Sequence, residues 1–186
     1  MKLNLGCGLN HMDGYVNVDK EAAAQPDMQV DLETFPWPFK DNSVKEIHMS
    51  HVLEHLGRDP QVFLAIMKEL YRICAPDTRI VITVPHPRHD HFLIDPTHVR
   101  PVLPETMDLF SKKLNREWSE TGASNTPFGF YLDVDFQVEE VNLKLDEQFE
   151  KEANADALSH EHVIDAMRIQ NNVVKQITMT LRVLKS

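Results

Sequence analysis

The sequence predicts an α/β fold with a mostly parallel sheet that ends in an antiparallel pair of strands. Two observations predict it. A helical pattern at 60–73 lies between strand-like segments at 44–49 and 79–84, and this order is typical of a parallel β-α-β unit. Later in the chain, residues 137–149 and 177–184 alternate between apolar and polar positions, as half-buried strands do. Two strands at the end of the chain suit an antiparallel pair at one edge.

The first forty residues predict three short strands, at 2–5, 15–19 and 28–32. Residues 35–39 read Phe-Pro-Trp-Pro-Phe and cannot form regular structure, because the two prolines remove backbone donors and fix φ. We therefore expect a loop there that lays aromatic rings against the rest of the protein.

The clearest helix begins at Asp59, a good N-cap, followed by Pro60, which suits the first helical position. Apolar residues then recur at helical spacing: Val62, Phe63, Ile66, Leu70 and Ile73. They predict one apolar face. Pro76 lies just beyond the predicted end. The β-branched run at 79–84 predicts a strand buried on both faces.

Residues 85–104 hold five prolines and four histidines without clear periodicity. A loop of this length in a domain is usually functional or mobile. His86, His89 and His91 could bind a metal, but no cysteine lies nearby, and we expect a polar loop without one. After it we predict a helix at 104–114, a loop at 117–130 and a helix at 159–171.

The 186 residues are 42% hydrophobic and 26% charged, which predicts one globular domain spanning 1–186. The chain has no apolar run long enough for a membrane span and no apolar stretch after Lys2 typical of a secretory signal. The two cysteines, Cys7 and Cys74, lie far apart and are expected to be reduced thiols. Together these features predict a cytoplasmic protein. The sequence does not predict its oligomeric state.

A formal net charge of −10 opposes non-specific binding to nucleic acid, whose affinity comes mainly from Lys and Arg meeting phosphates. An acidic protein suits a ligand that carries positive charge.

The most informative stretch is the first strand, which runs directly into Gly6-Cys7-Gly8. Two glycines at a strand end allow a sharp turn and leave the main chain open to a ligand. The dinucleotide fingerprint fails, because His11 occupies the third glycine position. Residues 6–14 are also too few for a helix whose N-terminus holds a pyrophosphate. They predict a tight, irregular crossover and a ligand without a phosphate.

Asp19 ends the second predicted strand. A carboxylate at that place can accept hydrogen bonds from both hydroxyls of a ribose, as in doubly wound nucleotide-binding folds. A plain strand-end or capping Asp is the alternative interpretation. Its position after the Gly-Cys-Gly turn favours the ribose role.

With these residues in view, the sequence resembles the class I S-adenosylmethionine-dependent methyltransferases, and most closely a small prokaryotic and phage branch with a short first crossover. The resemblance covers about residues 2–110 and is most specific in its first half. The stretches that carry it are Leu3–Gly8, Gly14–Asp19, Asp31–Leu32, Pro36–Ser43, Ser50–Leu56 and Asp95–Pro101. The last of these is similar to a stretch in relatives, some of which act on sugars or polysaccharides.

The resemblance implies a Rossmann-like, doubly wound, mostly parallel sheet of seven strands with a reversed last pair. It also implies S-adenosylmethionine as the cofactor. The implied contacts are Gly6, Cys7 and Gly8 with the methionine part, Asp19 with the ribose, Asp31 and Leu32 with the adenine, and Ser50 and His51 at the methyl-transfer site. Asn4 stands where many members carry an acidic residue; it can still hydrogen-bond the cofactor's amino group, but more weakly.

A competing motif overlaps the same residues. His51, Glu54 and His55 spell His-x-x-Glu-His, which on a helix could ligate zinc in a metallopeptidase. Such a site needs a long helix, and Gly57, Asp59 and Pro60 cut this one short. We therefore expect no metal, and keep the peptidase as a minor alternative.

Methyl transfer is a displacement at a carbon that the sulfonium already activates, so the protein must mainly align donor and acceptor. If the acceptor is a hydroxyl, a base helps to remove its proton, and histidine is suited to this. The candidate bases are His51, His55 and His98. A small molecule or a glycan hydroxyl is the expected acceptor. The second interpretation is a cofactor-binding domain that lacks catalysis or needs a partner.

Overall fold

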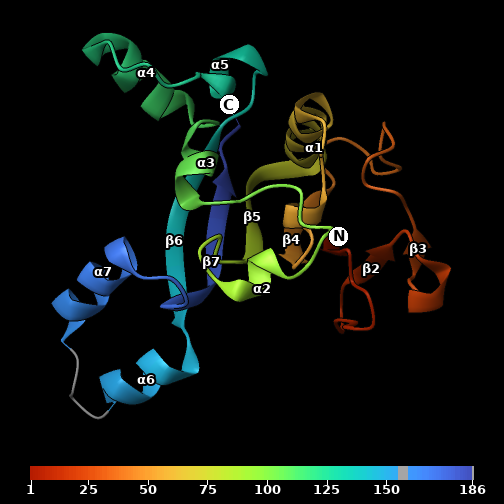
Figure 1. The fold of residues 1–186 in the computed structure, drawn as a ribbon. Coiled ribbons are helices and arrows are strands. Elements are labelled where there is room, and N and C mark those ends of the chain that lie inside the picture. Colours follow the sequence, from red (N-terminus) through yellow and green to blue (C-terminus); the bar gives the residue numbers. More distant parts are fainter. Residues whose placement is uncertain (155–158, 186) are drawn as a thin grey trace.

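A seven-stranded sheet with the order β3-β2-β1-β4-β5-β7-β6 organises the chain (Figure 1). The structure, a computed structural model, describes residues 1–154 and 159–185. The pairs β1–β2, β2–β3, β1–β4 and β4–β5 are parallel. The pairs β5–β7 and β7–β6 are antiparallel. The predicted α/β class, seven-stranded sheet and reversed last pair are confirmed.

The strands of the parallel part are short at the edge and longer toward the centre. Their bounds are β1 Lys2–Leu5, β2 Val16–Asp19, β3 Met28–Gln29, β4 Val44–Ser50 and β5 Cys74–Pro85. Two 3-10 turns, η1 Ala22–Ala24 and η2 Leu53–His55, follow β2 and β4. Helix α1, Pro60–Ile73, connects β4 to β5. The Asp59 carboxylate accepts from the Gln61 amide, so the predicted N-cap is confirmed.

The second half contains shorter helices and the two antiparallel strands. The helices are α2 Asp90–Leu93, α3 Pro104–Asp108, α4 Lys112–Thr121, α5 Phe128–Tyr131, α6 Glu147–Asn154 and α7 His160–Ile169. The strands are β6 Phe136–Leu145 and β7 Val174–Val183.

Three predicted boundaries in this half were wrong. The helix expected at 104–114 ends at Asp108, and a new helix begins after Ser111, whose hydroxyl accepts from the Leu114 amide. The expected loop at 117–130 contains the end of that helix, to Thr121, and the short α5. The strand expected at 137–149 ends at Leu145, because the next amide, of Asp146, bonds to the Val173 carbonyl and a helix follows.

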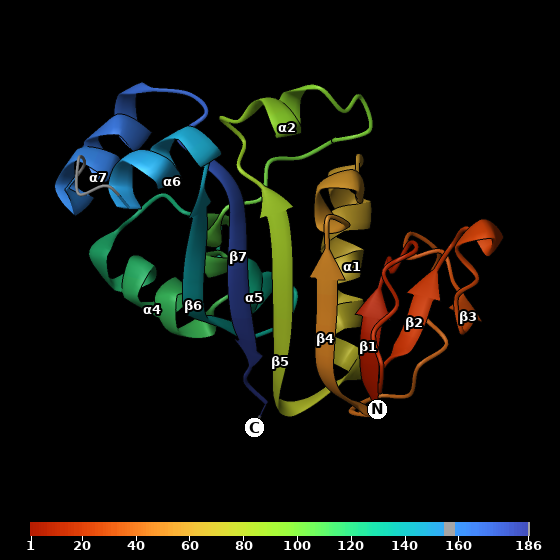
Figure 2. The same cartoon turned by 90° about the horizontal axis from the view of Figure 1, so that it is seen from below.

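Apolar side chains of the sheet pack into one core with residues of α1, α3 and α5. Figure 2 shows α1 and α5 behind the strands. Ile47, Met49, Ile80 and Ile82 point into this core and are at most 1% exposed. Phe63 of α1 meets Phe110, after α3, with ring centroids 6.2 Å apart. These contacts join α1 and the α3 region into one core.

The opposite face of the sheet is polar and partly exposed. Val81 and Thr83 of β5 alternate with the buried residues and are half-buried. The prediction that this strand is buried on both faces was therefore wrong, although the strand itself is confirmed.

The crossover from β1 to β2 has no helix and is held by buried amides. The Asn4 side chain, 4% exposed, donates to the Asn10 carbonyl and to Oδ1 of Asn17, both at 2.9 Å. Oδ1 of Asn17 also accepts from the Met12 amide, and Asp27 in turn accepts from Asn17. This network stabilises the tight irregular crossover that the sequence predicts.

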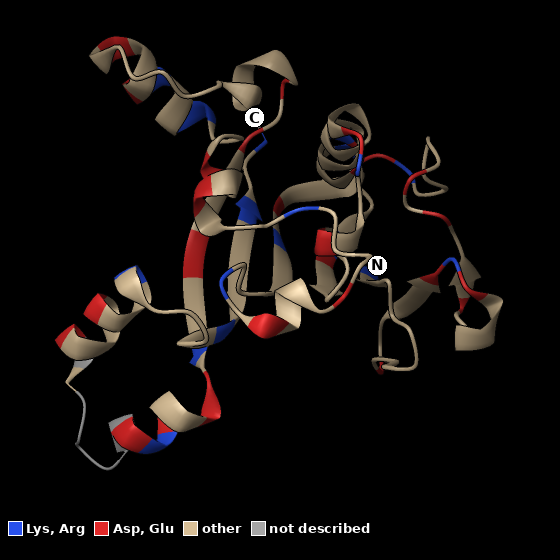
Figure 3. Ribbon diagram, viewed as in Figure 1, with Lys and Arg blue, Asp and Glu red and all other residues tan. Residues whose placement is uncertain are grey.

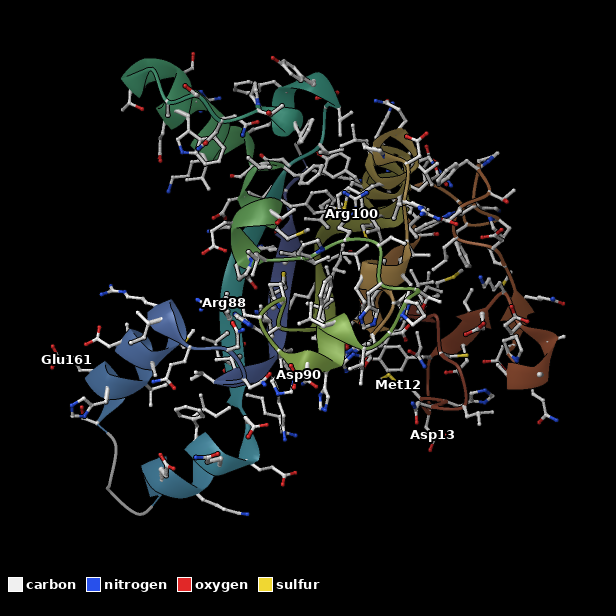
Figure 4. The ribbon with its side chains drawn as sticks, in the orientation of Figure 1. Met12, Asp13, Arg88, Asp90, Arg100 and Glu161 are labelled. Atoms are coloured by element: carbon white, nitrogen blue, oxygen red, sulfur yellow. The ribbon has the colours of Figure 1, made fainter. Side chains whose placement is uncertain are left out.

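The loop after β5 is anchored to the far end of the sheet. Arg88 donates to the carbonyls of Met167 and Arg168 at the end of α7 (Figure 4). His89, 4% exposed, lies 3.3 Å from Asp146 through Nε2, and its Nδ1 accepts from the His91 amide. The loop therefore has fixed ends, and His89 is a structural contact between β5 and the β6–α6 junction.

Candidate active site

The sheet reverses its winding between β1 and β4. From β1 the chain adds β2 and β3 on one side, and β4 and β5 lie on the other. In open α/β sheets, ligands bind in the crevice outside the carboxyl ends of the strands at such a point. Gly6 follows β1 directly, and His51 follows β4. The fold therefore brings the glycine turn and the first candidate histidine to one place.

Gly6 has no room for a side chain. Its φ is +67°, and a β-carbon would lie 2.4 Å from Cγ2 of Val52. Val52 is itself buried beside the start of η2. Because both the backbone conformation and the close approach exclude a side chain, the main chain at Gly6 stays bare toward the crevice.

Asp19 ties the glycine turn to the second strand. Its Oδ2 accepts from the Gly8 amide at 2.8 Å, and its Oδ1 accepts from the Glu21 amide at 2.9 Å. A carboxylate offers about four acceptor positions, so each oxygen keeps capacity for a further donor. The two backbone bonds fix the carboxylate at the rim of the crevice.

A cavity of about 350 Å³ lies between these residues. Its lining comprises Gly6, Asp19, Lys20, Val30, Asp31, Leu32, Glu33, His51, Val52, His55, Leu56 and Thr97. The volume lies in the range of ligand sites. The lining holds three acidic residues, Asp19, Asp31 and Glu33, and one lysine, so it is acidic. Its apolar residues come from the β3 and η2 regions. The cavity fits a ligand with an apolar flat part, a diol and a positive charge.

Only some of the residues predicted to contact the cofactor line this cavity. Gly6, Asp19, Asp31, Leu32 and His51 line the cavity. The other four residues do not line it: Asn4, Cys7, Gly8 and Ser50. The Asn4 side chain donates to the Asn10 carbonyl in the crossover. Cys7 is 4% exposed, and its amide donates to the Val18 carbonyl. For all nine residues, contact with the cofactor stays a prediction.

Several lining residues were missed by sequence reasoning. Val30 and Glu33 flank the predicted adenine pair, and their place after the third strand could have indicated them. Glu33 also accepts from the Gly57 amide at 2.7 Å and so joins the β3 side to the segment after η2. Thr97 belongs to a loop that is far from these residues in sequence, and no sequence pattern indicates that it lines the cavity.

A second hollow adjoins the cavity through His51 and His55. Its volume is about 610 Å³, and its lining is His51, His55, Pro85, His91, Ile94, Asp95, Pro96 and His98. Helix α2 and the following loop lie over the carboxyl end of β5, on this side of the sheet (Figure 2). Of the histidines predicted as bases, His51 and His55 line both cavities, and His98 lines the second.

His51 lies at the junction in an unusual backbone conformation. Its φ is +57°, and its amide donates to the Thr83 carbonyl at 2.8 Å. Its Nδ1 is 3.3 Å from Oε1 of Glu54, which is fully buried. Contact with Glu54 raises the pKa of His51 above its usual value, against a smaller opposing effect of burial. A non-glycine residue with positive φ at a site is typical of strain held for function.

The metallopeptidase alternative does not fit this geometry. A zinc site of that kind needs both histidines on one face of a helix. Here Leu53–His55 is a single 3-10 turn, and His51 precedes it in a left-handed conformation. The sequence expectation that Gly57, Asp59 and Pro60 end any helix early is confirmed.

The comparison with protein families decides which class of protein this crevice belongs to. Residues 3–82, which run from β1 through α1 into β5, match the model of a methyltransferase domain. The match, with the fold, confirms the predicted class I superfamily, the methyltransferase class of enzyme and S-adenosylmethionine as the cofactor. No curated protein matches the chain in sequence.

Solved structures of methyltransferases share the whole fold. A SAM-dependent methyltransferase from Archaeoglobus fulgidus is 20% identical, with a TM-score of 0.63 over 97% of this chain and 85% of that one. One from Methanosarcina mazei is 14% identical, with a TM-score of 0.52 over 100% and 92%. The [4+2]-cyclase SpnF is 13% identical, with a TM-score of 0.55 over 100% and 74%. At these identities the likeness concerns the fold alone.

The described helices include none that is both long and apolar enough to cross a membrane. Acidic residues stand out on α6 and α7, while Lys and Arg are spread over several elements (Figure 3). That spread gives no reason to revise the prediction that nucleic acid is not the partner.

Proposed function

We propose that the protein transfers a methyl group from S-adenosylmethionine to a hydroxyl of a small molecule or a sugar, within one domain that spans 1–186. The observation that carries the proposal is the pair of joined cavities at the carboxyl ends of the strands. One has the shape and charge for the cofactor, and the other offers imidazoles and a carboxylate that can hydrogen-bond a polyhydroxylated acceptor.

In the first cavity, the chain's own residues bind and orient the cofactor. The cofactor supplies a methyl group on a sulfonium. The bare backbone at Gly6 would accommodate its amino-acid part, the Asp19 carboxylate would accept from its ribose, and Leu32 would pack against its adenine. The acidic lining would stabilise the positive charge.

At the junction, His51 is the best placed base. Its side chain is 48% exposed and lines both cavities, and its Nδ1 lies 3.3 Å from the Glu54 carboxylate. Its ring would take the proton of an acceptor hydroxyl as the methyl group passes from the sulfur to the acceptor oxygen. His98 is less suited, because its side chain is only 7% exposed, and His55 has Thr97 Oγ1 rather than a carboxylate beside its Nδ1.

The second candidate function is cofactor binding without methyl transfer by this chain alone. The neighbour SpnF supports keeping it, because it is a [4+2]-cyclase on the same fold. A fold hosts several chemistries, and the site decides between them.

The test incubates the purified protein with S-adenosylmethionine labelled in the methyl group and with pools of sugars and small hydroxyl compounds. We expect label in an acceptor, and a loss of about 100-fold in His51→Ala, within the usual contribution of a general base. His48→Ala is the matched control, since His48 lies on β4, just before His51, and lines neither cavity. Cofactor binding without transfer in any pool would favour the second candidate.

A further inference from the structure

A buried carboxylate without a hydrogen-bond donor lies beside the two cavities. The Glu54 side chain is fully buried, and neither Oε1 nor Oε2 has a hydrogen-bond partner among the described residues. His51 Nδ1 approaches Oε1 to 3.3 Å, but without hydrogen-bond geometry. A buried charge is costly unless it is paired or coordinates a metal. Among the described residues, His51 is the one cationic partner of Glu54, and its Nδ1 faces only Oε1.

Two histidines complete a cluster with this carboxylate. One ring nitrogen of His55, one of His98 and one oxygen of Glu54 all lie within 4.8 Å of one another. The rings of His55 and His98 have centroids 4.6 Å apart. His98 stacks on Phe92, with centroids 5.2 Å apart. The cluster joins η2 to the loop 95–101, which are more than forty residues apart in sequence.

The hydrogen bonds of the two rings assign their protons. His98 Nδ1 lies 2.8 Å from the Phe92 carbonyl oxygen, which can only accept, so Nδ1 carries the proton. The Thr97 hydroxyl donates to Asp95, so Thr97 Oγ1 accepts from His55 Nδ1 at 2.9 Å. In the neutral rings both Nε2 atoms therefore keep a lone pair. A ring nitrogen that keeps its lone pair is an acceptor, as the carboxylate is, so the cluster can supply three acceptor atoms.

We propose that Glu54, His55 and His98 bind a divalent transition-metal ion of the zinc type. Imidazole nitrogen and carboxylate oxygen are ligands that such ions prefer. An imidazole whose other nitrogen donates to a carbonyl or hydroxyl is the usual arrangement of a metal-binding histidine. Ligand atoms around zinc lie about 3.3 Å apart, so those of the three atoms that lie farther apart than this would approach one another when the ion binds. The sequence alone predicted no metal.

Three protein ligands leave a coordination position open toward the second cavity, which His55 and His98 line. An acceptor hydroxyl bound there would lose its proton more readily. That consequence rests on the proposed function, whereas metal binding itself does not.

The test strips the full chain with a chelator and titrates it with Zn²⁺ by calorimetry and with Co²⁺ by visible absorption. We expect one ion per chain, and a loss of at least 100-fold in affinity for His98→Ala and for Glu54→Gln. His91→Ala is the matched control, because His91 lines the same cavity outside the cluster, and it should bind as wild type does. Thermal melting and adenosylhomocysteine affinity show that each variant is folded.

Absence of stoichiometric binding in wild type would overturn the metal site, and so would unchanged affinity in folded His98→Ala and Glu54→Gln. Labelled methyl transfer separates the two proposals. If the protein binds the metal but transfers no methyl group, the metal site is supported and the proposed function fails. If metal-free protein transfers methyl groups fully and no metal binds in the titration, the proposed function is supported and the metal site fails.

Discussion

The Gly8 amide donates a hydrogen bond to Oδ2 of Asp19 over 2.8 Å, so the glycine turn after β1 and the carboxylate at the end of β2 form one unit. Each holds the other at the rim of the cofactor cavity.

Asp19→Asn tests the carboxylate with little change of shape. The amide oxygen can replace the acceptor of the Gly8 or of the Glu21 amide but not both, and the charge that a ribose hydroxyl would meet is lost. We expect adenosylhomocysteine affinity to fall about 30-fold, equivalent to about 2 kcal/mol for a hydrogen bond to a charged group. Calorimetry measures it. Asp13→Asn, in the exposed part of the crossover, is the control and should bind normally. Equal affinity in both variants would remove Asp19 from the ribose.

Gly6→Ala tests the bare backbone. The new β-carbon would meet Val52 at 2.4 Å, in a conformation that already disfavours side chains. Gly14→Ala has the same sign of φ, +80°, but no atom within 4 Å of the new carbon. We expect Gly14→Ala to cost about 1 to 2 kcal/mol through the backbone alone. Gly6→Ala should cost more and weaken adenosylhomocysteine binding. Melting curves measure stability and calorimetry measures the affinity. Equal losses in Gly6→Ala and Gly14→Ala would show that the close approach to Val52 does not matter.

The pH dependence of stability has an identifiable contributor in Glu69. Its carboxylate accepts from Arg72 and from the Trp37 amide, each at 2.7 Å. The Arg72 guanidinium beside it lowers the pKa of Glu69 below its usual value. A folded-state pKa below the unfolded one gives stability that is present above the unfolded pKa and is lost as pH falls through the folded pKa.

Denaturant titrations of wild type and Glu69→Gln should therefore converge as pH drops below about 4.5, the usual value. At neutral pH we expect the free energy of unfolding of the variant to be lower by about 2 kcal/mol, because the neutral amide accepts less well from the Arg72 guanidinium and the Trp37 amide. A constant difference at every pH would show that the charge of Glu69 is not what matters.

Both cysteines should resist alkylation in the folded protein. Cys74 is fully buried, and burial raises the pKa of its thiol to about 12. Burial also raises the pKa of Cys7, which is 4% exposed. The thiolate is the reactive form, so labelling by iodoacetamide at pH 8, followed by mass spectrometry, should be slow until denaturant is added. Rapid modification of either cysteine in the native state would contradict this burial.

Local signals in the sequence predicted the fold and the cofactor half of the site. Strand periodicity, the Asp59-Pro60 start of α1 and the glycine turn each act within a few residues, so they can be recognised without tertiary contacts. The break after Asp108 could not be predicted from periodicity. It depends on Asn115, whose buried side chain donates to the Leu109 carbonyl.

The acceptor half of the site depends on contacts between distant segments. Glu54 appears in the sequence only as part of a short motif, yet its side chain is fully buried, and its carbonyl accepts from the Val99 amide. The tautomers of His55 and His98 depend on Thr97 and on the Phe92 carbonyl, and no sequence pattern reports those hydrogen bonds. Sequence reasoning therefore named the histidines but not what they do together.

The central claim is that the crevice between β1, β2 and β4 holds S-adenosylmethionine, and a crystal structure grown with adenosylhomocysteine measures it most directly. The account predicts the ribose hydroxyls within hydrogen-bond distance of Asp19, the adenine against Leu32 and the sulfur facing His51. Adenosylhomocysteine bound elsewhere on the protein, or a crevice filled by its own side chains at saturating ligand, would contradict it.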